Sequence, residues 1–301
     1  MKILILGNSS IFQRKIFPSL VKFKKLSLEV ASKRKNDFNK DIKTYKSYKD
    51  SIKKTEAKIV YISLINSEHF KWALFALKND KHVIIDKPFT LKLKETKTLI
   101  NHAFKKKLFL SEAVVFHEHL RFKNLLKKIN INKKTNILAS FHIPKLNKTN
   151  FRNHQKYGGG CFNDMSTYAA YLIYLFIGKK KYKLKKINKE KNLNEFFSLS
   201  ANSRLVKITA SFKFNAEYKN QIIIENNSKK YSINYAFSPP IDKKTNIIVQ
   251  FDKKKEYKLN FKKQNTFDIY FSNIFNLIKK NKYKFFYEEI EKISKIKKKI
   301  Y

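Results

Sequence analysis

Short apolar runs alternate with longer amphipathic stretches through the first third of the chain, and this alternation constrains the fold most. The runs are continuously apolar, as in KILILG at residues 2–7. Such runs are typical of strands in a parallel sheet that helices cover on both faces. Parallel strands are joined by crossover helices, so strand and helix alternate along the chain. The pattern predicts a doubly wound α/β domain.

Five strands and three helices are expected in this domain. The strands cover residues 2–7, 26–32, 58–64, 81–86 and 108–116, and the helices cover residues 11–23, 67–80 and 91–107. Doubly wound sheets bind ligands beyond the carboxyl ends of their strands. Residues that directly follow these strands are therefore candidates for a binding site.

The pattern changes after residue 116, where we place the boundary between a domain of residues 1–116 and one of residues 117–301. Alternating apolar and polar runs, such as residues 204–214 and 220–227, are typical of antiparallel strands. Helices are expected at residues 117–129, directly after the glycines at 158–160, and at 267–280 and 284–299. The second domain is expected to be α+β, with an open and mainly antiparallel sheet.

The formal net charge of +44 raises the possibility of nucleic-acid binding. However, only five of the 67 basic residues are arginine, the residue best suited to phosphates and base edges. Lysine, asparagine, isoleucine and phenylalanine are abundant while glycine and proline are scarce, which is the bias of AT-rich codons. We expect solvated lysine surfaces and no specific nucleic-acid partner.

The single cysteine, Cys161, excludes an internal disulfide and a cysteine-based zinc site. The longest apolar stretch, residues 168–178, is too short to cross a bilayer, and no signal peptide is apparent. We expect a cytoplasmic protein without a membrane partner. His117 and His119 have no acidic cluster beside them except Glu118, so no metal site is expected.

The first strand runs into a loop that only partly fits a dinucleotide fingerprint. A G-x-G-x-x-G motif would have three glycines, and this chain has Gly7, Ser9 and Phe12 at those places. The missing glycines weaken the expected backbone contact to a pyrophosphate. The hydroxyls of Ser9 and Ser10 are expected to compensate by donating hydrogen bonds.

Two other stretches stand out. Pro88 denies Lys87 a helical backbone, accommodates a cis peptide bond, and holds that lysine at the carboxyl end of the fourth strand. Three of only five glycines are consecutive, at residues 158–160, and a helix follows at once. Glycine allows close approach of the backbone to a ligand, or simply a tight turn before a core helix. Asp164 and Tyr168 lie four residues apart and share one face of that helix.

Together these stretches resemble the Gfo/Idh/MocA oxidoreductase family. The matching residues are Asn66, His69, Lys81, His82, Val83, Lys87, Pro88, Arg152, Gly158, Gly159, Gly160, Asp164 and Tyr168. The chain departs from the family pattern by carrying Ile65 for proline, Asp86 for glutamate and Phe151 for tryptophan. The two motifs are well separated and occur in the family's order.

The resemblance implies NAD(P)-dependent hydride transfer on a sugar, sugar nucleotide or polyol. Lys87 and Tyr168 take the places of the catalytic lysine and the acid-base residue, with Asp164 and His117 expected to contact substrate. The expected cofactor-binding residues are Gly7, Ser9, Ser10, Ser32, Lys33, Arg34, Asn66, His69, Asp86, Lys87 and Arg152. A homodimer or homotetramer is expected because family members commonly pair their open sheets.

The second strand ends in Ser32, Lys33 and Arg34, with no acid before Asp37. NAD enzymes place an acid there to bind the ribose 2′-hydroxyl, whereas a hydroxyl and basic side chains suit a 2′-phosphate. We therefore favour NADP(H), with NAD(H) as the alternative.

The leading hypothesis is an NADP(H)-dependent reductase of a keto-sugar, linked to a nucleotide and used in surface-polysaccharide synthesis. One alternative is an NAD-dependent polyol or inositol dehydrogenase, although those relatives usually carry histidine in the place of Tyr168. The other is a non-catalytic nucleotide- or polyanion-binding protein, which the altered first loop favours.

Overall fold

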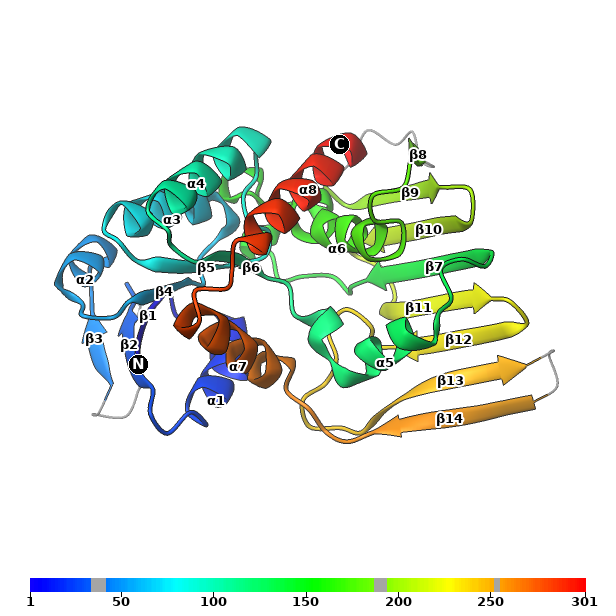
Figure 1. The fold of residues 1–301 in the computed structure, drawn as a ribbon. Coiled ribbons are helices and arrows are strands. Elements are labelled where there is room, and N and C mark those ends of the chain that lie inside the picture. Colours follow the sequence, from blue (N-terminus) through cyan, green and yellow to red (C-terminus); the bar gives the residue numbers. More distant parts are fainter. Residues whose placement is uncertain (34–41, 187–193, 252–254) are drawn as a thin grey trace. The chain divides into compact units, whose positions relative to one another are not determined.

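The computed structural model describes residues 1–33, 42–186, 194–251 and 255–301. The chain forms two compact units (Figure 1). The first contains Met1–Val114 and Phe267–Ser294, and the second contains Val115–Thr266 and Lys295–Tyr301. These units differ from the expected division into residues 1–116 and 117–301, because residues 267–294 pack with the first unit.

The first unit contains a six-stranded parallel sheet, as the continuous apolar runs predicted. Its strands are β1 (Lys2–Leu6), β2 (Ser27–Ala31), β3 (Lys43–Tyr45), β4 (Ile59–Ile62), β5 (His82–Asp86) and β6 (Leu110–Ala113). Their order is β3-β2-β1-β4-β5-β6, and every neighbouring pair is parallel. The order reverses between β1 and β4, and doubly wound sheets bind ligands beyond the carboxyl ends at such a point.

The helices of the first unit follow the predicted alternation. After β1 the chain is π-helical over η1 (Phe12–Ile16) and continues as α1 (Phe17–Leu20). The others are α2 (Tyr48–Lys54), the 3-10 segment η2 (Asn66–Glu68), α3 (His69–Lys78), α4 (Leu93–Lys105) and α7 (Thr266–Lys279). α3 packs against α4 and against β4 and β5. The last helix, α8 (Phe285–Ile300), spans the division after Ser294.

Side-chain contacts of α7 explain why residues 267–294 belong to the first unit. The Tyr270 hydroxyl lies 2.7 Å from the Ser111 hydroxyl of β6. The Phe271 ring lies 5.9 Å from that of Tyr61 in β4. Periodicity along the chain indicates a helix with an apolar face, but it carries no information on which sheet that face will cover.

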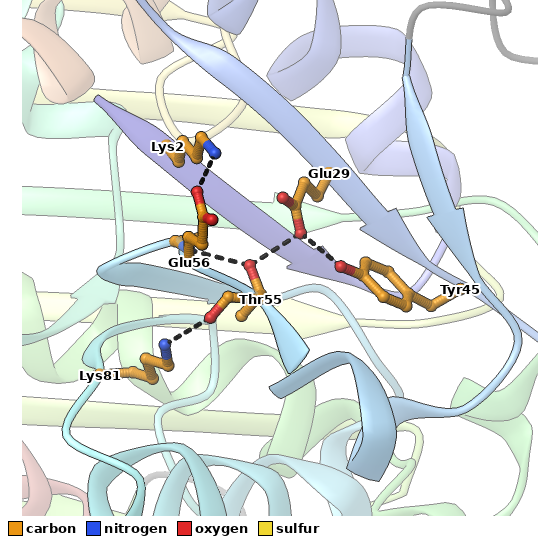
Figure 2. Close-up of polar contacts among 7 residues, drawn as sticks. Lys2, Glu29, Tyr45, Thr55, Glu56 and Lys81 are labelled. Carbon is orange, nitrogen blue, oxygen red and sulfur yellow. Dashed lines mark hydrogen bonds and ion pairs between the residues drawn. The ribbon is translucent and has the colours of Figure 1, made fainter. Parts of the chain in front are cut away.

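The sequence analysis did not predict β3 and α2, which are short and rich in lysine. A network around Glu29 of β2 holds them in place (Figure 2). The buried Glu29 carboxylate accepts hydrogen bonds from the Tyr45 hydroxyl at 3.0 Å and the Thr55 hydroxyl at 2.7 Å. Lys81 donates to the Thr55 carbonyl at 2.9 Å, and Lys2 forms an ion pair with Glu56. These are long-range contacts that a local pattern does not reveal.

The second unit contains an eight-stranded, mainly antiparallel sheet, as predicted. Its order is β14-β13-β12-β11-β7-β10-β9-β8, and only the β7–β10 pair is parallel. The strands are β7 (Thr135–His142), β8 (Lys183–Lys186), β9 (Phe196–Asn202), β10 (Val206–Lys213), β11 (Lys219–Asn226), β12 (Lys229–Asn234), β13 (Thr245–Phe251) and β14 (Lys255–Phe261).

Helices cover one face of this sheet. α5 (Leu120–Lys128) contacts β13, and α6 (Cys161–Phe176) contacts β9 and β10. Arg121 of α5 donates to the carbonyls of Asn234 and Tyr235, which ties α5 to the end of β12. Short 3-10 segments lie at η3 (Phe116–Glu118), η4 (Phe151–Asn153) and η5 (Gln155–Tyr157). Across the described ranges, no helix is both long and apolar enough to cross a membrane.

Candidate functional site

Gly7 ends β1 at the point where the strand order reverses. Its φ is +99°, and a Cβ atom there would lie 2.2 Å from the Ser63 carbonyl oxygen. Its amide donates to the Ala31 carbonyl of β2, while the Ser63 amide donates to the Leu6 carbonyl. Glycine is therefore required at this turn, as a nucleotide-binding loop between β1 and β4 demands.

The hydroxyl of Ser9 is engaged within the protein, which corrects the expectation that it compensates for a missing glycine. Ser63 donates to the Asp86 carboxylate at 2.6 Å, so its single hydroxyl hydrogen is used. Ser9 lies 2.7 Å from the Ser63 oxygen and must donate to it. Ser9 also accepts from the Phe12 amide at 3.1 Å, as a helix cap does. No hydroxyl hydrogen of Ser9 remains for a phosphate.

The helix after this loop still offers backbone donors. Among the described residues, the amides of Ser10 and Ile11 have no hydrogen-bond acceptor, because they precede the first helical bonds. A helix N-terminus with open amides attracts phosphate groups. The Ser10 hydroxyl is exposed and accepts from Arg14 Nε at 3.1 Å. Phe12, at the third glycine position, is fully buried. The loop therefore fits a dinucleotide through Gly7 and two backbone amides.

The residues expected to bind the 2′-phosphate of the cofactor's ribose lie at the end of β2. Ser32 is buried, and its amide donates to the Tyr45 carbonyl at 2.9 Å. Lys33 is exposed, with its ammonium 5.8 Å from the centre of the Tyr48 ring. Arg34 lies outside the described residues. Glu29 is the acid nearest the strand end here, and the Tyr45 and Thr55 hydroxyls already occupy its carboxylate.

Lys87 directly follows β5, and its neighbours in the chain are held firmly. The Lys87–Pro88 peptide bond is cis. The Asp86 carboxylate accepts from the Tyr61 and Ser63 hydroxyls, while burial raises its pKa above the ordinary value. The Phe89 amide donates to the buried Glu112 carboxylate at 2.8 Å. The Lys87 backbone is thus fixed from β4 and β6.

Two residues expected to bind cofactor lie just before α3. Asn66 is buried at the start of η2. His69 is fully buried, and both of its ring nitrogens face backbone carbonyls: Nδ1 lies 2.8 Å from the Pro88 oxygen and Nε2 lies 3.1 Å from the Leu64 oxygen. The sequence analysis expected His69 to contact a cofactor, whereas in the structure both ring nitrogens contact the protein's own backbone.

In the second unit, the consecutive glycines allow a tight backbone turn before α6. A Cβ atom on Gly159 would lie 2.6 Å from the carbonyl oxygens of Phe151 and Arg152. The amides of Gly158, Gly159 and Gly160 donate to carbonyls of residues 152–155. The amides of the three glycines are thus bonded within the protein. Their role is to let the chain turn tightly against η4 before α6 begins.

Tyr168 lies two turns into α6 and is half-buried among aromatic rings. The rings of Phe116, Phe141 and Phe237 have their centres 5.9, 5.5 and 5.1 Å from its own. His117 stacks on Tyr171 of the same helix, with ring centres 5.2 Å apart. The aromatic rings orient the Tyr168 ring.

Asp164 and Arg152, which the sequence analysis assigned to substrate and to cofactor, form an ion pair. Arg152 Nε lies 2.9 Å from Asp164 Oδ1, and the aspartate is buried while the arginine is partly exposed. A buried carboxylate needs such a partner. The pair joins η4 to the first turn of α6.

A cavity of about 290 Å³ opens beside this pair. Its lining combines cationic and amide side chains: Lys145, Lys148, Arg152, Asn153, Gln155, Asn194 and Asn215. Glu195 is its acidic member. Cations and amide donors suit a polar, anionic group such as a phosphate.

Sequence reasoning did not identify Ser63 and Glu112 as part of the site. Ser63 directly follows β4, so its position after a buried strand was a usable signal. Glu112 interrupts the apolar run at residues 108–116, and a carboxylate inside such a run indicates a buried partner. In the described part of the chain, no three histidine, cysteine or acidic residues cluster as metal ligands.

The family profile described as an oxidoreductase family with an NAD-binding Rossmann fold matches residues 1–114. Over these residues the chain is similar to the Gfo/Idh/MocA family. The profile match covers the first unit up to Val114, which contains Gly7, His69 and Lys87.

Curated relatives match over part of their length. The dTDP-3,4-didehydro-2,6-dideoxy-alpha-D-glucose 3-reductase of Saccharopolyspora spinosa is 32% identical over 126 residues, which cover 41% of this chain and 38% of that enzyme. The trans-1,2-dihydrobenzene-1,2-diol dehydrogenase of Danio rerio is 29% identical over 143 residues, covering 46% of this chain and 42% of that enzyme. The chain thus matches less than half the length of each.

A solved structure resembles the chain over nearly its whole length. It is a 3-ketoreductase from Actinomadura kijaniata in complex with NADP and TDP-benzene, with a TM-score of 0.85 and 18% identity. The match covers 98% of this chain and 95% of that one. The likeness confirms the fold of both units, a doubly wound sheet and an open sheet covered by helices.

Proposed function

We propose that the protein is an NADP(H)-dependent oxidoreductase that reduces a keto group of a sugar, and that the sugar is linked to a nucleotide. The observation that carries this proposal is Lys87, fixed at the carboxyl edge of β5 within the segment that matches the oxidoreductase family. The first loop supports it, because Gly7 and the open amides of Ser10 and Ile11 fit a pyrophosphate.

The proposed chemistry assigns one task to each side chain. Bound NADPH would supply a hydride to the carbonyl carbon of the substrate. Tyr168 donates its phenolic proton to the carbonyl oxygen, so the ketone gains one hydride and one proton and becomes an alcohol. The ammonium of Lys87 stabilises the negative charge that develops on that oxygen. Solvent returns the proton to Tyr168.

Three features support the NADP(H) and nucleotide-sugar parts of the proposal. Ser32 and Lys33 lie at the end of β2, and the carboxylate of Glu29 is already bonded within the sheet. The similar 3-ketoreductase was solved with NADP and TDP-benzene. The cavity lined by Lys145 and Lys148 suits the phosphates of such a substrate. We place the reaction in the cytoplasm, where NADPH is available.

The spacing of Lys87 and Tyr168 is similar to that of two residues replaced in variants of that 3-ketoreductase. A tyrosine and a lysine of the enzyme were each replaced in solved structures. The two positions are separated along its chain by nearly the same number of residues as Lys87 and Tyr168 are here. This spacing supports the assignment of both residues as catalytic.

We also propose that the protein self-associates through the open face of its second sheet. Residues on β7 alternate, with Ile137, Ala139 and Phe141 facing the helices and Leu138 on the opposite face. Leu138 is paired with Thr209 of β10 and Ile223 of β11. Its side chain is 51% exposed at the centre of the sheet.

Fluorescence titration and steady-state kinetics test the enzymatic proposal. NADPH should bind more tightly than NADH, and a reversed preference would overturn the NADP(H) assignment. Lys87→Met and Tyr168→Phe should each lower kcat with a keto-sugar nucleotide about 100-fold or more, because both act on the carbonyl oxygen. Lys94→Met and Tyr174→Phe are the matched controls on α4 and α6 and should keep wild-type rates. Cofactor binding without turnover would favour the non-catalytic alternative.

A further inference from the structure

The imidazole of His69 connects two loops at the carboxyl edge of the first sheet. It lies at the start of α3 with none of its surface exposed. Nδ1 is 2.8 Å from the Pro88 carbonyl oxygen, next to Lys87. Nε2 is 3.1 Å from the Leu64 carbonyl oxygen, in the loop after β4. The ring therefore spans from the β4 loop to the β5 loop.

The number of N–H groups on the ring determines which of the two contacts is a hydrogen bond. A carbonyl oxygen only accepts, so the ring must donate to it, and a neutral imidazole has one N–H group. Burial lowers the pKa of His69 below its usual range, although the Pro88 carbonyl and the charge of Asp86 act in the opposite direction. The ring therefore holds one N–H at neutral pH, and we assign it to Nδ1, which makes the shorter contact.

Other side chains hold the residues around Pro88. Asp86 is fixed by the Tyr61 and Ser63 hydroxyls, and the Phe89 amide is fixed by Glu112. Pro88 has no amide hydrogen, so only its carbonyl can anchor it by hydrogen bonding. His69 is the side chain that the structure shows bonded to this carbonyl. Loss of the His69 ring would remove this hydrogen bond at the centre of the turn that carries Lys87.

We propose that His69 is a positioning residue for Lys87, which it orients by donating from Nδ1 to the Pro88 carbonyl. The proposal rests on the function assigned above, because it places Lys87 in the reaction. It goes beyond a structural role in the core, since it predicts that only one of the two ring contacts matters for turnover.

Two isosteric substitutions separate the contacts. In His69→Asn the amide nitrogen takes the place of Nδ1, which keeps a donor for Pro88 and loses the contact to Leu64. In His69→Gln the amide nitrogen takes the place of Nε2, which keeps a donor for Leu64 and loses the one for Pro88. We expect His69→Asn to retain at least about a third of the wild-type kcat and His69→Gln to lose about tenfold, with KM for NADPH unchanged in both. Equal loss in the two variants would overturn the proposal.

A double-mutant cycle tests whether His69 acts through Lys87. In a Lys87→Met background, His69→Gln should lower kcat no further, because there is no ammonium left to position. A further tenfold loss would mean that His69 acts elsewhere, which contradicts the proposal.

Hydrogen exchange gives a readout that does not depend on activity. The peptide covering residues 86–90 should exchange at least about threefold faster in His69→Gln than in His69→Asn, because the turn opens when its central hydrogen bond is lost. Equal exchange at equal Tm would overturn the inference. If the wild-type protein shows no reductase activity, the proposed function fails, while this measurement still reports whether His69 holds the Lys87 turn.

Discussion

The hydroxyl of Ser9 shows how single residues reshape the first loop. Ser9 donates to Ser63, Ser63 donates to Asp86, and Asp86 immediately precedes Lys87. In a loop with the second fingerprint glycine this chain of donors would not exist, because glycine has no hydroxyl. The substitution therefore links the end of β1 to the ends of β4 and β5. It replaces a close backbone approach with a hydrogen-bonded connection to Asp86, the neighbour of the proposed catalytic residue Lys87.

We expect the titration of His119 to have a clear effect on the free energy of unfolding. It precedes α5, and its Nδ1 accepts from the Arg121 amide at 3.1 Å, as a helix cap does. The residue is 1% exposed, and its Nε2 has no hydrogen-bond partner among the residues that the structure describes. Burial and the nearby Arg121 charge lower the pKa of His119 to about 4. Protonation removes the cap and buries a charge.

The sign of the pH effect follows from that pKa. The unfolded chain binds a proton near pH 6.5, whereas folded His119 does not until about pH 4. Between these values the unfolded state holds more protons, so the free energy of unfolding falls by up to about 3 kcal/mol as the pH drops. Denaturant titrations at pH 7 and pH 4 should show this loss in the wild type. His119→Asn keeps a cap but does not titrate, so its loss should be smaller by a similar amount. Parallel curves for both proteins would exclude this role.

At the level of elements, the helix after β1 is adapted to a large side chain. A third glycine would allow close packing of this helix on the sheet, and Phe12 stands there instead. Its ring is fully buried and contacts the edge of the Phe17 ring at a centroid distance of 5.8 Å. The segment η1 (Phe12–Ile16) is π-helical where it carries this ring. Phe12 is therefore part of the core that positions the nucleotide loop.

A small residue in place of Phe12 should destabilise the folded protein. Phe12→Ala should lower the free energy of unfolding by about 3–5 kcal/mol, because it leaves a cavity under the helix. Thermal and denaturant unfolding measure this, with Phe104→Ala as the control. Phe104 is 60% exposed on α4, and its removal should cost well under half as much. If Phe12→Ala were neutral and tightened NADPH binding, the ring would be an obstacle to the cofactor and not a structural element.

At the scale of the whole molecule, chain order and compact units do not coincide. The first unit is completed by residues 267–294, which follow the entire second sheet in sequence. The hydrogen bond between the Tyr270 and Ser111 hydroxyls and the packing of Phe271 on Tyr61 hold α7 in the first unit. The nucleotide-type unit therefore depends on the C-terminal part of the chain for its core.

The oligomeric proposal makes a prediction at this scale. Sedimentation should show a dimer or tetramer, and Leu138→Lys should shift it to the monomer by placing a charge at the centre of the open sheet face. Leu120→Lys is the matched control, since Leu120 is 53% exposed on α5, at the helix-covered face of the sheet. It should leave the assembly intact. A wild-type monomer, or equal effects of the two substitutions, would contradict the proposed interface.

The sequence alone determined most of the succession of elements, with β3 and α2 as exceptions, because continuous apolar runs, alternating runs and helical periodicity are local properties of the chain. It also placed Lys87 and Tyr168 within recognisable motifs. The tertiary structure decided the side chains' partners: it joined Asp164 to Arg152, packed Gly159 on Phe151, and removed His69 from the cofactor contacts. The tertiary structure also packed α7 against the first sheet. Each of these depends on long-range contacts, whose partners a local pattern does not specify.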